Sequence, residues 1–166
     1  SDDTVDRRFD NLSLTMGGNT SVGAVDLTAR LLHAEGNTAY SDFFLAPVDQ
    51  DFDNSAASLK GAVATGGQGR LTMTAAYMLD EIRQSQSPDF LETDRLTFDA
   101  QQDWRANDQH SLSAGVQYSD EDAKSLSFGL PFDETTEFWN LFVQDQIVYG
   151  AHRSVLAVGY TDHETA

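Results

Sequence analysis

The 166-residue chain has no cysteine, only three prolines, and ten lysines and arginines against 27 aspartates and glutamates. The absence of cysteine excludes a disulfide framework and a thiolate metal site. A net charge of −17 with few, scattered basic residues argues against nucleic-acid binding, because a phosphate-binding face needs clustered lysine and arginine. No apolar run reaches about 18 residues, which excludes a transmembrane helix. Residues 1–6 are acidic and lack the basic and apolar regions of a signal peptide, so we expect the chain to begin after processing or inside a longer protein.

What the chain does contain is one-by-one alternation of apolar and polar residues. In the clearest stretch, 71–79, Leu71, Met73 and Tyr77 fall on one side, while Thr72 and Thr74 fall on the other. A side-chain period of two predicts a β-strand with two unlike faces. Eight such stretches follow one another, at roughly 7–17, 22–33, 56–65, 71–79, 93–104, 111–118, 136–149 and 153–161.

The connections between these stretches alternate between tight and long. Glycine, asparagine and aspartate predict tight turns at 17–20, 66–69, 105–109 and 150–152. Longer connections are predicted at about 34–54, 81–92 and 120–135. All the tight turns then lie at one edge of the sheet and all the long loops at the other, which is the rhythm of outer-membrane β-barrels.

Alternation alone also fits a soluble β-sandwich, in which the apolar face is the core. The aromatic residues favour the membrane instead, since Trp104, Tyr77, Tyr118 and Trp139 lie near strand ends on the apolar side, as in the aromatic girdles of a barrel. We therefore predict an all-β, antiparallel meander of eight strands within a transmembrane β-barrel. Its convex, lipid-facing side is expected to carry Leu27, Leu59, Met73, Phe98, Val116 and Leu141, and its concave side Arg30, Lys60, Thr72, Asp99 and Gln117.

Segments 30–36, 49–54 and 138–146 resemble TonB-dependent outer-membrane receptors, and most of all the cobalamin receptor (BtuB-like) group. The resemblance implies a large barrel of about 22 strands, of which this chain supplies a part. Residues 1–166 match the barrel only: no plug domain is recognised, and 161–166 lack the aromatic ending of a closing C-terminal strand. An interior barrel segment in the bacterial outer membrane is the expected context.

The resemblance also implies a function. The expected activity is outer-membrane transport of a scarce, large, cobalamin-like nutrient, with the TonB system acting through the missing plug and this chain contributing barrel wall and capture loops. A siderophore receptor of the same family is one alternative. Others are a complete small eight-stranded barrel with a structural or adhesive role, and a soluble β-sandwich binding module.

Acidic residues in the first long connection are candidate calcium ligands. Asp49, Asp51 and Asp53 occupy alternate positions, with Asp42 upstream and Asp80 at the end of a later strand. Crowded carboxylates need a neutralising cation, and Ca²⁺ takes six to eight oxygen ligands. The resemblance implies calcium as well, because cobalamin receptors bind it through acidic outer loops. A solvated acidic loop in a generally acidic chain is the alternative.

In the same connection, Tyr40, Phe43 and Phe44 form an apolar group that is either a ligand-contacting tip or a loop packing on itself. Enzyme signals are weak. The four histidines have no ligand-like spacing and are interpreted as strand-end or turn residues, and there is no nucleophile elbow or phosphate loop. We therefore expect no enzymatic activity.

Overall fold

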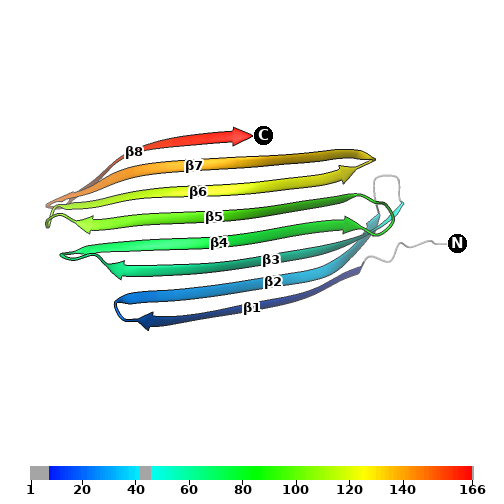
Figure 1. The fold of residues 1–166 in the computed structure, drawn as a ribbon, viewed down its shortest axis with the longest axis horizontal. Coiled ribbons are helices and arrows are strands. Elements are labelled where there is room, and N and C mark those ends of the chain that lie inside the picture. The colour runs from blue at the N-terminus through cyan, green and yellow to red at the C-terminus, as the bar shows by residue number, and fades with distance from the viewer. Residues whose placement is uncertain (1–7, 42–45, 166) are drawn as a thin grey trace.

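The computed structural model describes residues 8–41 and 46–165, which form a single antiparallel sheet of eight strands in sequence order (Figure 1). Every strand pairs only with its neighbours along the chain. The predicted all-β meander is therefore confirmed. The strands are β1 (Arg8–Val22), β2 (Val25–Ser41), β3 (Pro47–Ala64), β4 (Gly69–Gln84), β5 (Phe90–Arg105), β6 (His110–Ser127), β7 (Leu130–Tyr149) and β8 (His152–Thr165).

The register divides the side chains into an apolar face and a polar face, because directly paired residues project from the same side of a sheet. Met73 of β4 lies in register with Ala100, Val116 and Leu141 of the next three strands, and this row defines the apolar face. The next residue along β4, Thr74, defines the polar face. The predicted division holds for Leu27, Leu59, Met73, Phe98, Val116 and Leu141 on the apolar face and for Arg30, Lys60, Thr72, Asp99 and Gln117 on the polar face.

The described residues form one layer, and nothing in them covers the apolar face. Ala62 is the one buried hydrophobic residue among them, whereas Met73 is 56% and Leu59 is 54% exposed. A sandwich would bury these side chains against a second sheet. The sheet is also not closed, because β1 and β8 are its two edges. It therefore has neither a sandwich core nor the closure of a complete eight-stranded barrel.

Three of the four predicted tight turns are confirmed. The glycine-rich turn after β3 uses positive φ at Gly66 (83°) and Gly67 (55°), and Gly150 (58°) does the same between β7 and β8. The third lies between β5 and β6. The predicted turn at 17–20 is wrong, because this segment continues β1 and the chain reverses at Gly23 (φ 62°) instead. The turn preference of residues 17–20 is outweighed here by the pairing of β1 with β2. This pairing keeps the apolar residues of both strands on one face of the sheet.

The three predicted long connections are also wrong, since most of their residues extend the strands. β2 and β3 pair as far as Ser41 and Pro47, β4 and β5 leave only 85–89 between them, and β6 and β7 leave only Phe128 and Gly129. These hairpins reach out from the edge opposite the tight turns (Figure 1). Among the described residues no helix has the length and hydropathy needed to cross a membrane.

Candidate functional site

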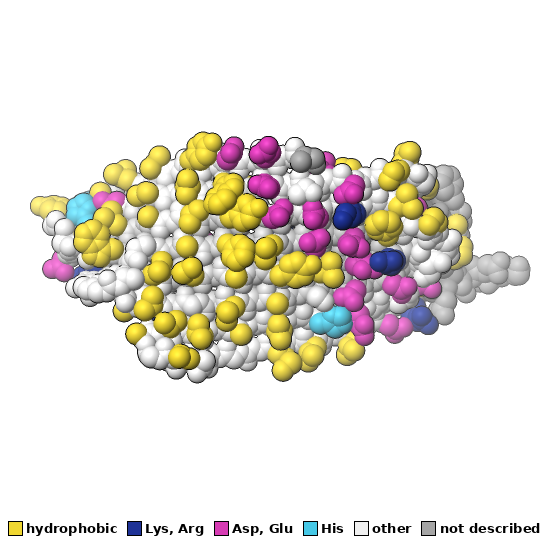
Figure 2. All heavy atoms as spheres, in the orientation of Figure 1, with side chains coloured by type: hydrophobic (Ala, Val, Ile, Leu, Met, Phe, Trp, Pro, Cys, Tyr) yellow, Lys and Arg dark blue, Asp and Glu magenta, His cyan; other side chains and the backbone are white. Residues whose placement is uncertain are grey.

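The apolar face changes character along each strand. From the tight-turn edge, β4 presents Leu71, Met73, Ala75, Tyr77 and Leu79, and the next residue on that face is Glu81. Figure 2 shows the same change across the sheet, with a broad field of hydrophobic side chains on one side of an oblique line of acidic ones and a smaller number beyond it. We call the first carboxylates past this apolar band the acidic boundary. They are Asp10, Glu35, Asp53, Glu81, Asp94, Asp120, Glu137 and Asp162, one on each strand from β1 to β8.

The acidic boundary is oblique to the strands by an amount that the register defines. Asp10 of β1 is in register with Arg83 of β4, whereas Asp162 of β8 is in register with Ala75 of the same strand. The boundary therefore shifts by eight residues along the strands between β1 and β8. A residue extends about 3.3 Å along a strand, and neighbouring strands lie about 4.8 Å apart. The shift of eight residues across the sheet therefore means that the strands are tilted by about 38° from the direction perpendicular to the boundary.

Aromatic residues flank the apolar band at both margins. Tyr118 and Trp139 are directly opposite each other just inside the acidic boundary, with ring centroids 4.6 Å apart. Tyr77 occupies the same margin on β4, and Trp104 lies at the tight-turn margin on β5. Near that second margin one carboxylate, Asp145, interrupts the apolar face. The predicted position near a strand end is confirmed for Trp104. It is wrong for Tyr77, Tyr118 and Trp139, which lie at mid-strand because the strands continue past the apolar band.

Beyond the acidic boundary the polar face becomes apolar. Phe52, Ile82 and Leu91 are directly opposite one another across β3, β4 and β5, and the ring of Phe9 stacks on Phe52 with centroids 6.2 Å apart. Phe132 of β7 continues the row. We call these five residues the aromatic patch. Phe9, Leu91 and Phe132 are exposed, so the patch is open to a ligand from the polar side.

A glycine makes room for this patch. Gly36 of β2 is directly opposite Phe52, and a Cβ at this position would come within 2.6 Å of the phenyl ring and 2.2 Å of the Asp10 carbonyl oxygen. The ring of Phe52 therefore lies over bare backbone. The aromatic patch was not predicted from the sequence, because Phe52 and Leu91 fall in segments that were expected to be long connections. Continued alternation of apolar and polar residues past the band was the signal that would have found it.

The candidate calcium ligands do not all come together. Asp49, Asp51 and Asp53 lie on β3 rather than in a loop, and they project from one face as their spacing predicted. Asn37 Nδ2 donates to Asp49 Oδ1 at 2.5 Å and to Asp51 Oδ1 at 2.8 Å.

Asp80 lies apart from these three aspartates. It is directly opposite Asn54, so it projects from the other face of the sheet, while Asp42 lies outside the described residues. Calcium binding stays a prediction, with Asp49, Asp51 and Asp53 together on one face of the sheet and Asp80 on the other.

Of the candidate ligand contacts, Tyr40 lies on β2 directly opposite Val48 and is 36% exposed. Its register places it on the polar face, the same face as the aromatic patch. Phe43 and Phe44 lie outside the described residues. The structure thus places one of the three predicted residues, Tyr40, on the same face as the five residues of the aromatic patch.

No protein-family model matches the sequence, and no curated protein matches it either. Solved structures do match the fold. The FrpB iron transporter from Neisseria meningitidis superposes with a TM-score of 0.81 at 12% identity over 95% of this chain and 32% of its own. The copper transporter OprC gives a TM-score of 0.78 at 10% identity over 97% of this chain and 30% of its own.

A third match is OmpT, an outer membrane protein of Vibrio cholerae, with a TM-score of 0.59 at 18% identity over 92% of this chain and 46% of its own. The chain therefore spans about a third of the two transporters and less than half of OmpT. Identities this low show the fold alone. The chain has the fold of part of an outer-membrane β-barrel.

Proposed function

We propose that this chain is part of the wall of a TonB-dependent transporter in the bacterial outer membrane, which imports a scarce, large, cobalamin-like nutrient. The observation that carries the membrane assignment is the oblique acidic boundary. A straight boundary at a tilt of about 38° agrees with the 35–45° at which strands cross membranes in barrels. A soluble sheet has no reason to align the first carboxylate of every strand along such a line.

The height of the apolar band supports the same assignment. On β4 the band runs from Leu71 to Leu79. Those nine residues extend about 30 Å along the strand, and a tilt of about 38° reduces this to a height of about 23 Å. The outward apolar band of outer-membrane barrels is about 25 Å tall, and a crossing strand needs about 9–11 residues.

The open edges fit a larger barrel. The outer edges of β1 and β8 expose backbone groups that the described chain does not pair, and unpaired groups in lipid cost several kcal/mol each. Further strands of the same protein would satisfy them, as the partial coverage of the two transporters suggests. The tight turns then face the periplasm and the extended hairpins face the outside.

In this orientation the polar face lines the barrel interior, and the aromatic patch faces its outer vestibule. The strands are 14 to 20 residues long, so the hairpins rise well beyond the membrane. An apolar surface on the inner side of these hairpins suits the capture of a bulky ligand, with Tyr40 next to it. Release inward would require the TonB system acting on a plug. No catalytic step is part of this proposal.

Iron–siderophore import is the second candidate, favoured by the likeness to an iron transporter. The experiment compares uptake of labelled cobalamin and of ferric siderophores by cells with and without the full-length protein, in strains with and without TonB. We expect cobalamin uptake that needs both proteins. Siderophore uptake alone would select the second candidate, and uptake of neither ligand, or uptake independent of TonB, would contradict the proposal.

A further inference from the structure

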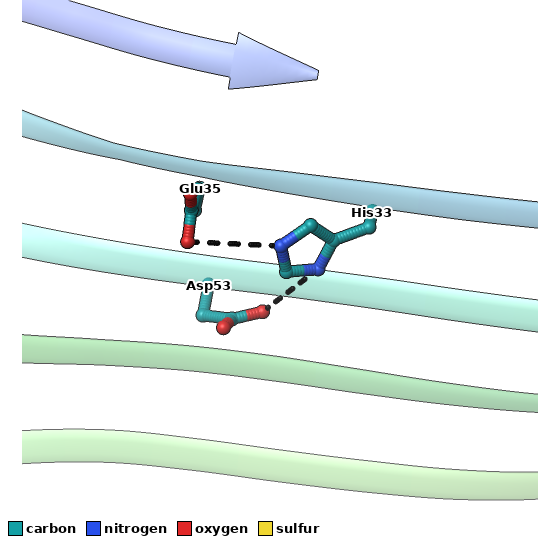
Figure 3. A group of neighbouring side chains, drawn as sticks. All are labelled: His33, Glu35 and Asp53. Carbon is teal, nitrogen blue, oxygen red and sulfur yellow. Dashed lines mark ion pairs between the residues drawn. The ribbon is translucent and has the colours of Figure 1, made fainter. Parts of the chain in front are cut away.

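His33, Glu35 and Asp53 form a compact group on the apolar face, at the acidic boundary (Figure 3). Glu35 follows His33 by two residues on β2, so both side chains leave the same face, and Asp53 of β3 is directly opposite Glu35. Each residue offers one ligand atom, and these atoms lie within 4.8 Å of one another. All three side chains are about half exposed, which leaves them accessible to an ion.

The distances from the imidazole of His33 to the two carboxylates are longer than hydrogen bonds. His33 Nε2 lies 3.7 Å from Glu35 Oε2, and His33 Nδ1 lies 3.5 Å from Asp53 Oδ1. N–H···O bonds are normally 2.7–3.2 Å. Two ligands on one tetrahedral ion with bonds of about 2.1 Å stand about 3.4 Å apart. The separation of His33 Nε2 from Glu35 Oε2 is close to this value, and the ligand atoms of all three residues lie within 4.8 Å of one another.

The register also places like charges against each other here. Asp53 is directly opposite Glu35 on one side and Glu81 on the other, and Glu81 is directly opposite Glu92. Directly opposed like charges destabilise a sheet. Arg83 forms ion pairs with Glu81 and with Glu92. Among the described residues, His33 is the group in ion-pair contact with Glu35 and Asp53.

We propose that His33, Glu35 and Asp53 bind a first-row divalent metal ion, with Zn²⁺ as the ion tested. One ring nitrogen of His33 and one oxygen from each carboxylate are the ligands. An imidazole with two carboxylates suits Zn²⁺ and its neighbours in the series, whereas Ca²⁺ prefers oxygen donors throughout. The ion links β2 to β3 and neutralises the opposed pair Glu35 and Asp53. Three protein ligands leave one position of a tetrahedral ion open.

Ser55 supports the assignment by fixing the ring. Its hydroxyl lies 2.9 Å from His33 Nδ1 and is directly opposite His33 in the register. Imidazoles that bind metals usually hold their second nitrogen in such a hydrogen bond. The inference depends on the register of β2 and β3 alone, so it stands whether or not the protein is a transporter.

The test is a Zn²⁺ titration of the full-length, chelator-stripped protein against a chromophoric competitor. We expect His33→Ala, Glu35→Gln and Asp53→Asn each to lower the Zn²⁺ affinity of the same site at least tenfold. Even substitution of the residues that hydrogen-bond to metal ligands typically lowers metal affinity 10–100-fold. His152→Ala is the matched control: an exposed imidazole on the same face, at the far edge of the sheet, expected to leave Zn²⁺ affinity unchanged.

Two further measurements separate a metal site from an ordinary ion pair. Co²⁺ bound in place of Zn²⁺ should give visible absorption that His33→Ala removes, and Zn²⁺ affinity should fall at low pH as protons compete for the ligands. Both carboxylate variants remove a like-charge pair and should fold at least as well as wild type. Zn²⁺ affinity of His33→Ala within twofold of wild type, or an equal loss in His152→Ala, would overturn the proposal.

Discussion

An arginine placed along β4 gives a direct test of where the lipid lies. Ala75 is at the middle of the apolar band, and Leu71 and Leu79 are four residues away on either side. Four residues along a strand tilted by about 38° correspond to about 10 Å of depth. Outward-facing arginine costs about 2–4 kcal/mol at the midplane of the bilayer and about 0–1 kcal/mol near its interfaces.

We therefore expect Ala75→Arg to lower the free energy of unfolding by about 2–4 kcal/mol relative to wild type. Arginine at position 71 or 79 should lower it by about 1 kcal/mol or less relative to alanine at the same position. Thr74→Arg, on the polar face, is the control and should differ little from Thr74→Ala. The assay is guanidinium unfolding of the full-length protein from lipid vesicles. Equal costs at all three outward positions, or a cost at Thr74 as large as at Ala75, would refute the reasoning.

Three other predictions concern packing, calcium and the sheet edges. A Cβ at Gly115 would come within 2.4 Å of the Phe142 ring, so Gly115→Ala should lower stability by about 1–3 kcal/mol in denaturant unfolding, whereas Gly18→Ala, with open space around it, should not. If Asp49 and Asp51 bind calcium, Asp49→Asn with Asp51→Asn should abolish the calorimetric heat that Ca²⁺ gives with wild type; equal heats in both would return them to a solvated acidic surface. The chain on its own should aggregate through the open edges of β1 and β8, and a protease-resistant monomer in liposomes would contradict this.

The two faces of the sheet could be predicted from sequence because a period of two survives in every strand. Leu59 and Lys60 are assigned to opposite faces by that period alone, and the pairing of β3 confirms it. Tight turns were predictable where glycine takes positive φ, as at Gly66. The turn signal at 17–20 misled because backbone pairing and a common apolar face outweigh local turn preference.

The outer ends of the strands could not be placed from composition. Asp49, Asp51 and Asp53 were assigned to a long connection, yet their alternate spacing is the strand period itself. The metal group around His33 was missed for a different reason. His33 and Asp53 are 20 residues apart in sequence, and only the register of β2 with β3 brings them together.

The tilt of the acidic boundary is the central claim, and the depth of spin labels in the membrane tests it most directly. Leu12, Leu79 and Tyr160 each precede the boundary by one position on the apolar face of their strands. Tyr160 is nevertheless in register with Met73, not with Leu79. Spin labels are attached to single cysteines at 12, 79, 160 and 73 in the full-length protein in bilayers, and their depth is measured from collisions with oxygen and with a water-soluble nickel complex. The labels at 12, 79 and 160 should lie at one common shallow depth, and the label at 73 should lie deeper. A label at 160 that matches the depth at 73, or free access of the nickel complex to all four, would contradict a tilted, membrane-spanning sheet.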